Sequence, residues 1–343
     1  MSGDNGESMP MTQGISRRTA LLGLAGGVTG LSMPSIRRAR AAIPIRFVMS
    51  WYAQAEFGGF YEALAKGYYA SEGLDVQIEA ASPQMNVPQL LLAGRADFIT
   101  GYDFQVLSAV ASGIPLVAVA STFQHDQQGL MTHDGITSPE QLRGHPILIA
   151  SSSHATFWPW LKEKYGFDDS QAARYTFNLQ PFFADPSAAV QAYASSEIWD
   201  ARQRGVPVRF FQFAGLGYPP YGAPIVTTRQ KIAQQGDTVG RFVKASLMGW
   251  RDYMNDPAMG NALIQQANNR MTPEHLAFGL SALRDAGALL SADTAVRGLG
   301  TMTAERWKAT RDFMVAHKLL AESADWQAAF TTTYVDALRI MPS

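Results

Sequence analysis

Residues 50–81 read SWYAQAEFGGFYEALAKGYYASEGLDVQIEAA, and this stretch decides the fold class. Its apolar residues recur at the spacing of one helical face: Phe57, Phe60, Tyr61, Leu64, Ala65 and Tyr68. Gly73 ends this helix, and the run Leu74–Glu79 that follows is typical of a strand. Another strand is expected before the helix, at Ile43–Met49. Strand, helix and strand in this order predict an α/β layer with parallel strands.

The rest of the chain continues the alternation of short apolar runs and helical patterns. Helix starts are marked by a capping residue followed by proline at Ser138 and Thr272. After about residue 236 the strand signals stop and helices dominate. Five further strands are expected: Asp97–Thr100, Leu116–Ser121, Ile147–Ala150, Val208–Phe213 and Pro224–Thr228.

A chain of 343 residues is long for one compact core, so we expect two lobes with mostly parallel sheets. The chain would cross between the lobes near His133–Gly135 and within Gly217–Pro224, whose sequence GYPPYGAP holds Tyr218 and Tyr221. Lobe one then comprises residues 42–134 and 222–343, and lobe two comprises residues 135–221.

The first forty residues have the pattern of a targeting signal. Arg17 and Arg18 stand directly before the weakly apolar segment Ala20–Met33, and small residues follow at Ala39 and Ala41. Residues 1–41 are therefore predicted to be a cleaved twin-arginine export signal, with a disordered basic tail as the alternative. We expect a periplasmic protein without a lipid anchor, because no cysteine follows the expected cut.

Composition excludes several kinds of chemistry. The chain has no cysteine, which excludes disulfides, thiolate catalysis and cysteine–metal sites. Its six histidines lack the spacing of a zinc site, so neither a metal nor a cofactor is expected. The formal net charge of −1 gives no reason to expect a nucleic-acid partner. No GxSxG motif is present, and the chain is not predicted to be an enzyme.

Several stretches resemble the periplasmic solute-binding proteins of ABC importers, in the branch that includes binders of thiamine pyrimidine precursors. They are FYEALAKGYYASEGLDVQI (60–78), residues 90–121, SPEQLRGHPILIA (138–150) and FVKASLMGWRDYMNDP (242–257). The resemblance implies a two-lobed type II periplasmic-binding fold with a hinge between the lobes. It also implies a small-molecule ligand and a membrane permease as partners, and a monomer is expected.

The resemblance also implies ligand-binding positions. Trp51 and Tyr52 resemble the aromatic pair that packs against the pyrimidine ring in this branch, and Glu197 in QAYASSEIWDA resembles the acid that hydrogen-bonds it. The loop with Tyr218 and Tyr221 resembles the segment that carries another stacking tyrosine. Ile198 and Ala53 depart from the pattern of the branch, which leaves room for a related ligand.

Other candidates come from their place after predicted strands, where open α/β sheets bind ligands. Tyr102 and Asp103 follow one strand, and an acid-lined aromatic cleft suits an amine-bearing ring. For Glu56 and Asp185 a solvated surface position is the expectation. Ser153 and His154 follow another strand and open a helix, a geometry that would suit an anion, although ordinary helix capping explains it equally well.

Three other functions are weighed against capture of a thiamine-precursor-like heterocycle. The first is binding of a sulfonate, nitrate or aromatic acid, and the second is a sensor that presents its ligand to a membrane receptor. The third is the pyrimidine synthase that this fold also hosts, which resembles the chain around residues 96–107. That enzyme uses a lysine, a histidine and a cysteine-rich iron motif, whereas this chain has Gly101 and Gln105 at the matching positions and no cysteine.

Overall fold

The computed structural model describes residues 41–82 and 85–342. Residues 1–40, which hold nearly all of the predicted export signal, lie outside the described residues. Among those described, no helix combines the length and the apolar character needed to cross a bilayer.

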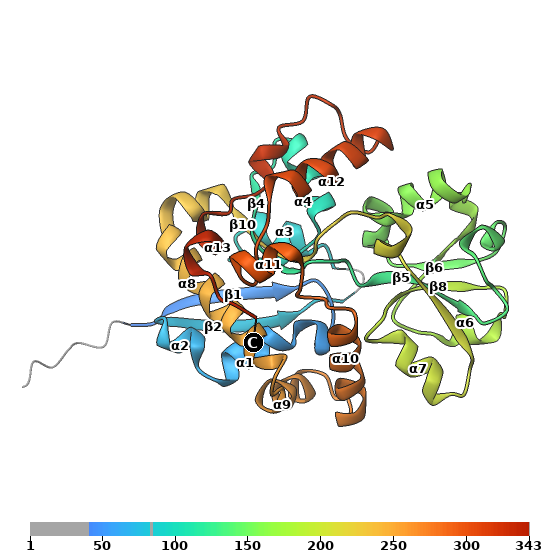
Figure 1. The fold of residues 1–343 in the computed structure, drawn as a ribbon, viewed down its shortest axis with the longest axis horizontal. Helices are drawn as coiled ribbons and strands as arrows, with labels where there is room; N and C mark the ends of the chain where they lie inside the picture. Colours follow the sequence, from blue (N-terminus) through green and yellow to red (C-terminus); the bar gives the residue numbers. More distant parts are fainter. Residues whose placement is uncertain (1–40, 83–84, 343) are drawn as a thin grey trace, which may run out of the picture. The chain divides into compact units, whose positions relative to one another are not determined.

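Two five-stranded sheets form the framework (Figure 1). The first has the order β2-β1-β3-β10-β4, and the second has the order β7-β6-β8-β5-β9. Strands of the first sheet are β1 (Ile43–Met49), β2 (Leu74–Ala80), β3 (Phe98–Thr100), β4 (Leu116–Phe123) and β10 (Gly222–Thr228). Strands of the second are β5 (Gln128–His133), β6 (Ile147–Ile149), β7 (Ala172–Arg174), β8 (Ala189–Tyr193) and β9 (Val208–Gln212).

Each sheet is mixed in the same way. Strand β1 pairs parallel with β2 and β3, whereas β10 pairs antiparallel with β3 and β4. In the second sheet β6 pairs parallel with β7 and β8, and β5 is antiparallel to β8 and β9. The predicted α/β fold with two lobes is confirmed, and each sheet has two parallel and two antiparallel pairings.

The helices surround both sheets (Figure 1). Those that follow strands of the first sheet are α1 (Gly58–Ala65), α2 (Tyr68–Ser71), α3 (Val87–Leu92) and α4 (Asp103–Ala111). Those of the middle segment are α5 (Phe157–Tyr165), α6 (Gln180–Ala184) and α7 (Glu197–Gln203). The C-terminal part contributes α8 (Arg229–Tyr253), α9 (Ala258–Ala267), α10 (Pro273–Asp285), α11 (Ala292–Arg297), α12 (Ala304–Ala316) and α13 (Thr333–Leu338).

The crossings between the sheets differ in part from the prediction. Because β5 belongs to the second sheet, the chain leaves the first sheet after Phe123 and enters the second at Gln128. The first crossing is therefore residues 124–127, earlier than the expected His133–Gly135. The return runs from the end of β9 to the start of β10, through residues 213–221, and overlaps the predicted segment. We use lobe one and lobe two for the parts built on the first and second sheets.

The predicted helix of the opening stretch is two helices. Gly67 has a φ of 69°, in the left-handed region that favours glycine, and it separates α1 from α2. Helix α1 packs tightly on α8. A Cβ atom on Gly249 would lie 2.1 Å from the carbonyl oxygen of Gly59, so the two helices approach as closely as they do only because glycine is present. This packing holds the segment after β1 against the core of lobe one.

Candidate functional site

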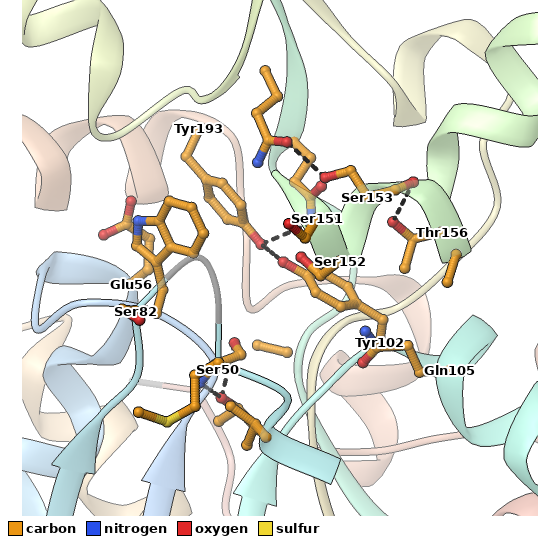
Figure 2. A pocket seen from close by; sticks show the side chains of 18 of the residues that line it. Ser50, Glu56, Ser82, Tyr102, Gln105, Ser151, Ser152, Ser153, Thr156 and Tyr193 are labelled. Carbon is orange, nitrogen blue, oxygen red and sulfur yellow. Dashed lines mark hydrogen bonds between the residues drawn. The ribbon is translucent and has the colours of Figure 1, made fainter. Parts of the chain in front are cut away.

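A cavity of about 500 Å³ lies between the lobes. Lobe one supplies residues at or just beyond the ends of β1, β2 and β3, among them Ser50, Ser82 and Tyr102. Lobe two supplies residues at or beyond the ends of β6 and β8, among them Ser152 and Tyr193 (Figure 2). Since side chains that follow neighbouring strands converge at one edge of a sheet, the fold itself gathers these groups around one space.

Hydrogen bonds join the two lobes around this cavity. Gln54 of lobe one donates to the Ser196 hydroxyl of lobe two over 3.0 Å. Figure 2 shows the Tyr102 hydroxyl pointing toward that of Tyr193, and the two oxygens are 3.3 Å apart. These bonds are made only when the lobes are in contact, so the structure is a closed form of the protein.

The predicted aromatic pair divides between two positions. Trp51 lines the cavity, and its ring stacks on that of Tyr175 in lobe two, with 6.4 Å between centroids and 24° between planes. Tyr52 does not line the cavity, because its ring packs against Phe177 of lobe two at 4.9 Å. Trp51 is therefore a cavity wall, whereas Tyr52 contributes to the contact between the lobes.

Glu197 is the first residue of α7 and lines the cavity. It is buried, with 3% of its surface exposed. The Tyr175 hydroxyl donates to its Oε1, and the backbone N–H of Tyr193 donates to its Oε2, each over 2.8 Å. Burial raises the pKa of Glu197 to about 7 in spite of these donors. A carboxylate offers about four acceptor positions, so Glu197 can accept further hydrogen bonds from a ligand.

Glu56 lines the same cavity, and the prediction of a solvated surface position was wrong. It lies in a short 3-10 helix, Ala55–Phe57, and only 4% of its surface is exposed. The Ser195 hydroxyl of lobe two donates to its Oε1 over 2.6 Å. Burial raises the pKa of Glu56. Sequence alone could not give this burial, because the residues that cover Glu56 include a segment about 140 positions further along the chain.

Asp185, the other acid expected at the surface, does not line the cavity and is half-buried. Its Oδ1 accepts hydrogen bonds from the N–H and the hydroxyl of Ser187, at 2.9 and 2.7 Å. The Ser187 hydroxyl lowers the pKa of Asp185. Asp185 thus holds a local turn between α6 and β8.

Asp103 was predicted to belong to the site but lies outside the cavity. Its side chain is fully buried at the start of α4, where Oδ2 accepts a hydrogen bond from the Tyr221 N–H over 3.0 Å. Burial raises the pKa of Asp103 to about 7. The carboxylate therefore fastens the second crossing to lobe one instead of facing a ligand.

The two tyrosines of the second crossing also lie outside the cavity. Tyr218 packs its ring between Phe104 of lobe one and Trp160 of lobe two, with centroids at 5.0 and 4.9 Å. The Tyr221 hydroxyl accepts a hydrogen bond from the N–H of Thr303 over 3.0 Å. Both rings are buried; Tyr218 contacts both lobes, whereas Tyr221 is held by lobe one.

Arg306 of α12 holds both crossings. Its Nη2 donates to the Gln124 carbonyl oxygen over 2.6 Å, and its Nη1 donates to the Gln124 side chain over 3.3 Å. The same guanidinium lies 3.8 Å from the centre of the Tyr221 ring. Gln124 belongs to the first crossing and Tyr221 to the second, so one side chain touches both connections between the lobes.

The serine segment after β6 is partly as predicted. Ser153 is buried, lines the cavity, and donates to Oε1 of Gln191 over 2.6 Å. His154 is exposed and does not line the cavity. Helix α5 begins only at Phe157, after a non-helical Thr156, so the serines lie in a separate 3-10 turn and not at the N-terminus of α5. The serines therefore open a 3-10 helix that lines the cavity, and they do not cap α5.

Most other cavity residues were missed by sequence reasoning. They are uncharged polar groups. Ser50, Ser82 and Thr100 lie at or near the ends of predicted strands, where a search of every strand end would have found them. Gln128, Gln191 and Tyr193 belong to β5 and β8, which were not predicted, and Gln105 lies in α4. Within the described chain, the residues lining the cavity include two carboxylates, Glu56 and Glu197, and no arginine, lysine or histidine. The cavity thus has acceptors and hydroxyl groups but no cation.

Residues 54–259 match the family model described as NMT1/THI5 like, which spans more than half of the chain. The chain belongs to this family. It is 27% identical to the riboflavin-binding protein RibY of Chloroflexus aurantiacus, over 85% of this chain and 86% of that protein. It is 24% identical to the formylaminopyrimidine-binding protein of Halalkalibacterium halodurans, over 84% and 89% respectively.

The fold matches that of solved periplasmic binding proteins. The alkanesulfonate-binding protein SsuA from Xanthomonas axonopodis pv. citri, solved bound to MOPS, aligns with a TM-score of 0.62 at 17% identity. The alignment covers 85% of this chain and 99% of that structure. This likeness concerns the fold alone, and it confirms the predicted periplasmic-binding architecture.

Proposed function

We propose that this chain is the periplasmic solute-binding component of an ABC importer and that it captures a small, amine-bearing nitrogen heterocycle. The observation that carries the proposal is the charge of the cavity. Two buried carboxylates, Glu56 and Glu197, line it together with one indole wall, and the described lining residues include no cationic side chain. Charge-assisted hydrogen bonds from N–H groups would satisfy such carboxylates.

Trp51 supplies the surface on which a flat ring would stack, a contact worth about 0.5–1.5 kcal/mol beyond burial. Tyr102, Ser153 and Glu197 are the other sequence-predicted candidates that line the cavity, and we propose them as polar contacts to the ligand. The inter-lobe bonds around the cavity support capture by closure, since a ligand held between two lobes is contacted from both sides.

The names of the two curated relatives support the same class of ligand. Riboflavin and formylaminopyrimidine are both nitrogen heterocycles. We propose delivery to a membrane permease as the next step. A cavity of about 500 Å³ lies within the range of pockets that hold small ligands, so size alone does not decide between a single ring and a fused ring system.

Binding of a sulfonate is the rival function with the most support from the fold, because sulfonate binders share it. An oxyanion in a dry cleft needs arginine, lysine or exposed helix N–H groups. Two buried carboxylates in the cavity would repel it. The charge of the lining therefore favours the heterocycle over the sulfonate.

Ligand screening by thermal unfolding tests the proposal. A panel would hold 4-amino-5-hydroxymethyl-2-methylpyrimidine, formylaminopyrimidine, riboflavin, an alkanesulfonate and benzoate. A ligand present at 100 times its dissociation constant adds about 2.7 kcal/mol of stability. We expect stabilisation by a nitrogen heterocycle and none by the two acids. Stabilisation by the sulfonate or benzoate alone would overturn the proposed ligand class.

A further inference from the structure

Glu56 Oε2 is a buried carboxylate oxygen without a hydrogen-bond partner among the described residues. The residue lines the cavity, as Figure 2 shows at its left edge, and its burial is nearly complete. An oxygen removed from water and left without a donor is unfavourable, and such atoms are rare in folded proteins. Less than 1 Å² of this oxygen is exposed, so a donor of a molecule bound in the cavity would reach it after a small rotation of the carboxylate.

The orientation of Glu56 is set by the opposite lobe. Ser195 of lobe two donates to Oε1 across the cleft. Only one of the two carboxylate oxygens is engaged in this way, so closure of the lobes holds the carboxylate in place with Oε2 free to accept. The same loop continues through Ser196 to Glu197, so closure brings the two acids to one cavity.

The two acids influence each other. The charge of Glu56 is one of the causes that raise the pKa of Glu197, after the larger effect of burial. Neither carboxylate has an arginine, lysine or histidine beside it among the residues lining the cavity. A ligand with N–H donors for both would relieve the burial of each oxygen and the repulsion between the two.

We propose that Glu56 is a second recognition residue, whose Oε2 accepts an N–H hydrogen bond from the ligand while Glu197 accepts another. The site would then select a heterocycle with at least two N–H donors over a ring of the same shape without them. This inference rests on the proposed function. An amino group on a pyrimidine ring carries two N–H bonds, and protonation of a ring nitrogen adds a third.

A rival chemistry for Glu56 can be separated by one substitution. A protonated Glu56 would donate to a carbonyl oxygen of the ligand, and glutamine would replace it without loss because its amide also donates. An ionised Glu56 only accepts, and Glu56→Gln would place a donor against the N–H groups of the ligand. The amide can still accept from Ser195, so the contact between the lobes is preserved.

The test measures the dissociation constants of two probes by isothermal titration calorimetry. The first probe is 4-amino-5-hydroxymethyl-2-methylpyrimidine, and the second is the same ring with hydrogen in place of the amino group. For Glu56→Gln we expect the affinity for the first probe to fall about 10- to 100-fold and that for the second to change little. The preference for the amino group should therefore shrink in this variant.

Glu62→Gln is the matched control. Glu62 is also a fully buried carboxylate of lobe one, but its Oε1 lies 3.4 Å from Lys66 Nζ and the residue does not line the cavity. This variant should keep the parent affinities for both probes. Ser195→Ala removes the inter-lobe bond and leaves the carboxylate, so it should weaken both probes alike and preserve the preference.

Three results would overturn the inference. One is equal affinity of the parent and Glu56→Gln for the amino probe, and another is an equal loss for both probes, which would indicate a structural role. In either case the proposed function stands, because the parent still binds. Failure of the parent to bind the amino probe or any other amino-bearing ring would overturn both proposals together.

Discussion

Replacing Tyr175 by phenylalanine removes one donor from Glu197 and keeps the ring that stacks on Trp51. The hydroxyl stabilises the ionised carboxylate and so lowers its pKa, which burial has raised to about 7. A hydrogen bond to a charged group contributes about 1.5–3 kcal/mol. Since about 1.4 kcal/mol corresponds to one pKa unit, we expect the pKa of Glu197 to rise by about one to two units in the variant.

The rise changes how ligand affinity depends on pH. An ionised Glu197 accepts an N–H hydrogen bond more strongly than a protonated one, so affinity increases as pH rises through its pKa. At pH 7 the parent is about half ionised, whereas the variant would be ionised to about a tenth or less. We expect Tyr175→Phe to bind 4-amino-5-hydroxymethyl-2-methylpyrimidine about five-fold or more weakly at pH 7, and to approach the parent above about pH 9.

Calorimetric titrations between pH 5.5 and 9.5 measure this shift. Tyr52→Phe is the control, because it removes a hydroxyl from the same aromatic cluster without touching Glu197 or the cavity. Its pH profile should coincide with that of the parent. Parallel profiles for Tyr175→Phe and the parent, offset by the same factor at every pH, would refute the reasoning.

Three other predictions concern stability and export. Burial raises the pKa of Asp126 to about 7, so its stabilising contribution is complete only below pH ~4 and is lost as pH rises through 7. Asp126→Asn should therefore raise the free energy of unfolding at pH 8, by on the order of 1–3 kcal/mol, and leave it unchanged at pH 4, as measured by urea titration. Gly249→Ala should lower the free energy of unfolding by about 1–3 kcal/mol, because the added methyl group would collide with α1. Gly135 has no atom within 4 Å of an added Cβ, so Gly135→Ala should leave the free energy of unfolding unchanged. Replacement of Arg17 and Arg18 by lysine should retain the protein in the cytoplasm, as seen by cell fractionation, and undiminished export would contradict the twin-arginine signal.

The lobes could be predicted from the sequence because most strands are short apolar runs. Strands β5 and β8 are not apolar runs and were not predicted. Strand β5 reads QGLMTH, and its first five residues are buried, so its polar side chains lie in the interior where sequence patterning expects apolar ones. Strand β8, AVQAY, carries Gln191, which serves as an acceptor for Ser153. Missing β5 moved the predicted first crossing to the wrong end of that strand.

The candidate site could be predicted only as far as strand ends could be placed. Trp51, Tyr102 and Ser153 follow predicted strands and line the cavity, whereas Glu197, which also lines it, was predicted from the family resemblance. Asp103 also follows a strand, but its partner is the Tyr221 N–H, which lies far away in sequence. The direction of a side chain beyond a strand depends on its contacts with the opposite lobe and with the crossings. These long-range contacts cannot be predicted from one sequence.

The contacts of Arg306 with both crossings have a mechanical consequence. Two separate connections would allow the lobes to twist and slide as well as to open. Because Gln124 and Tyr221 contact the same guanidinium, a shift of either residue changes a contact of the side chain that also holds the other. We infer that the two crossings bend together when the lobes open, so that the motion is closer to a hinge rotation than to a slide.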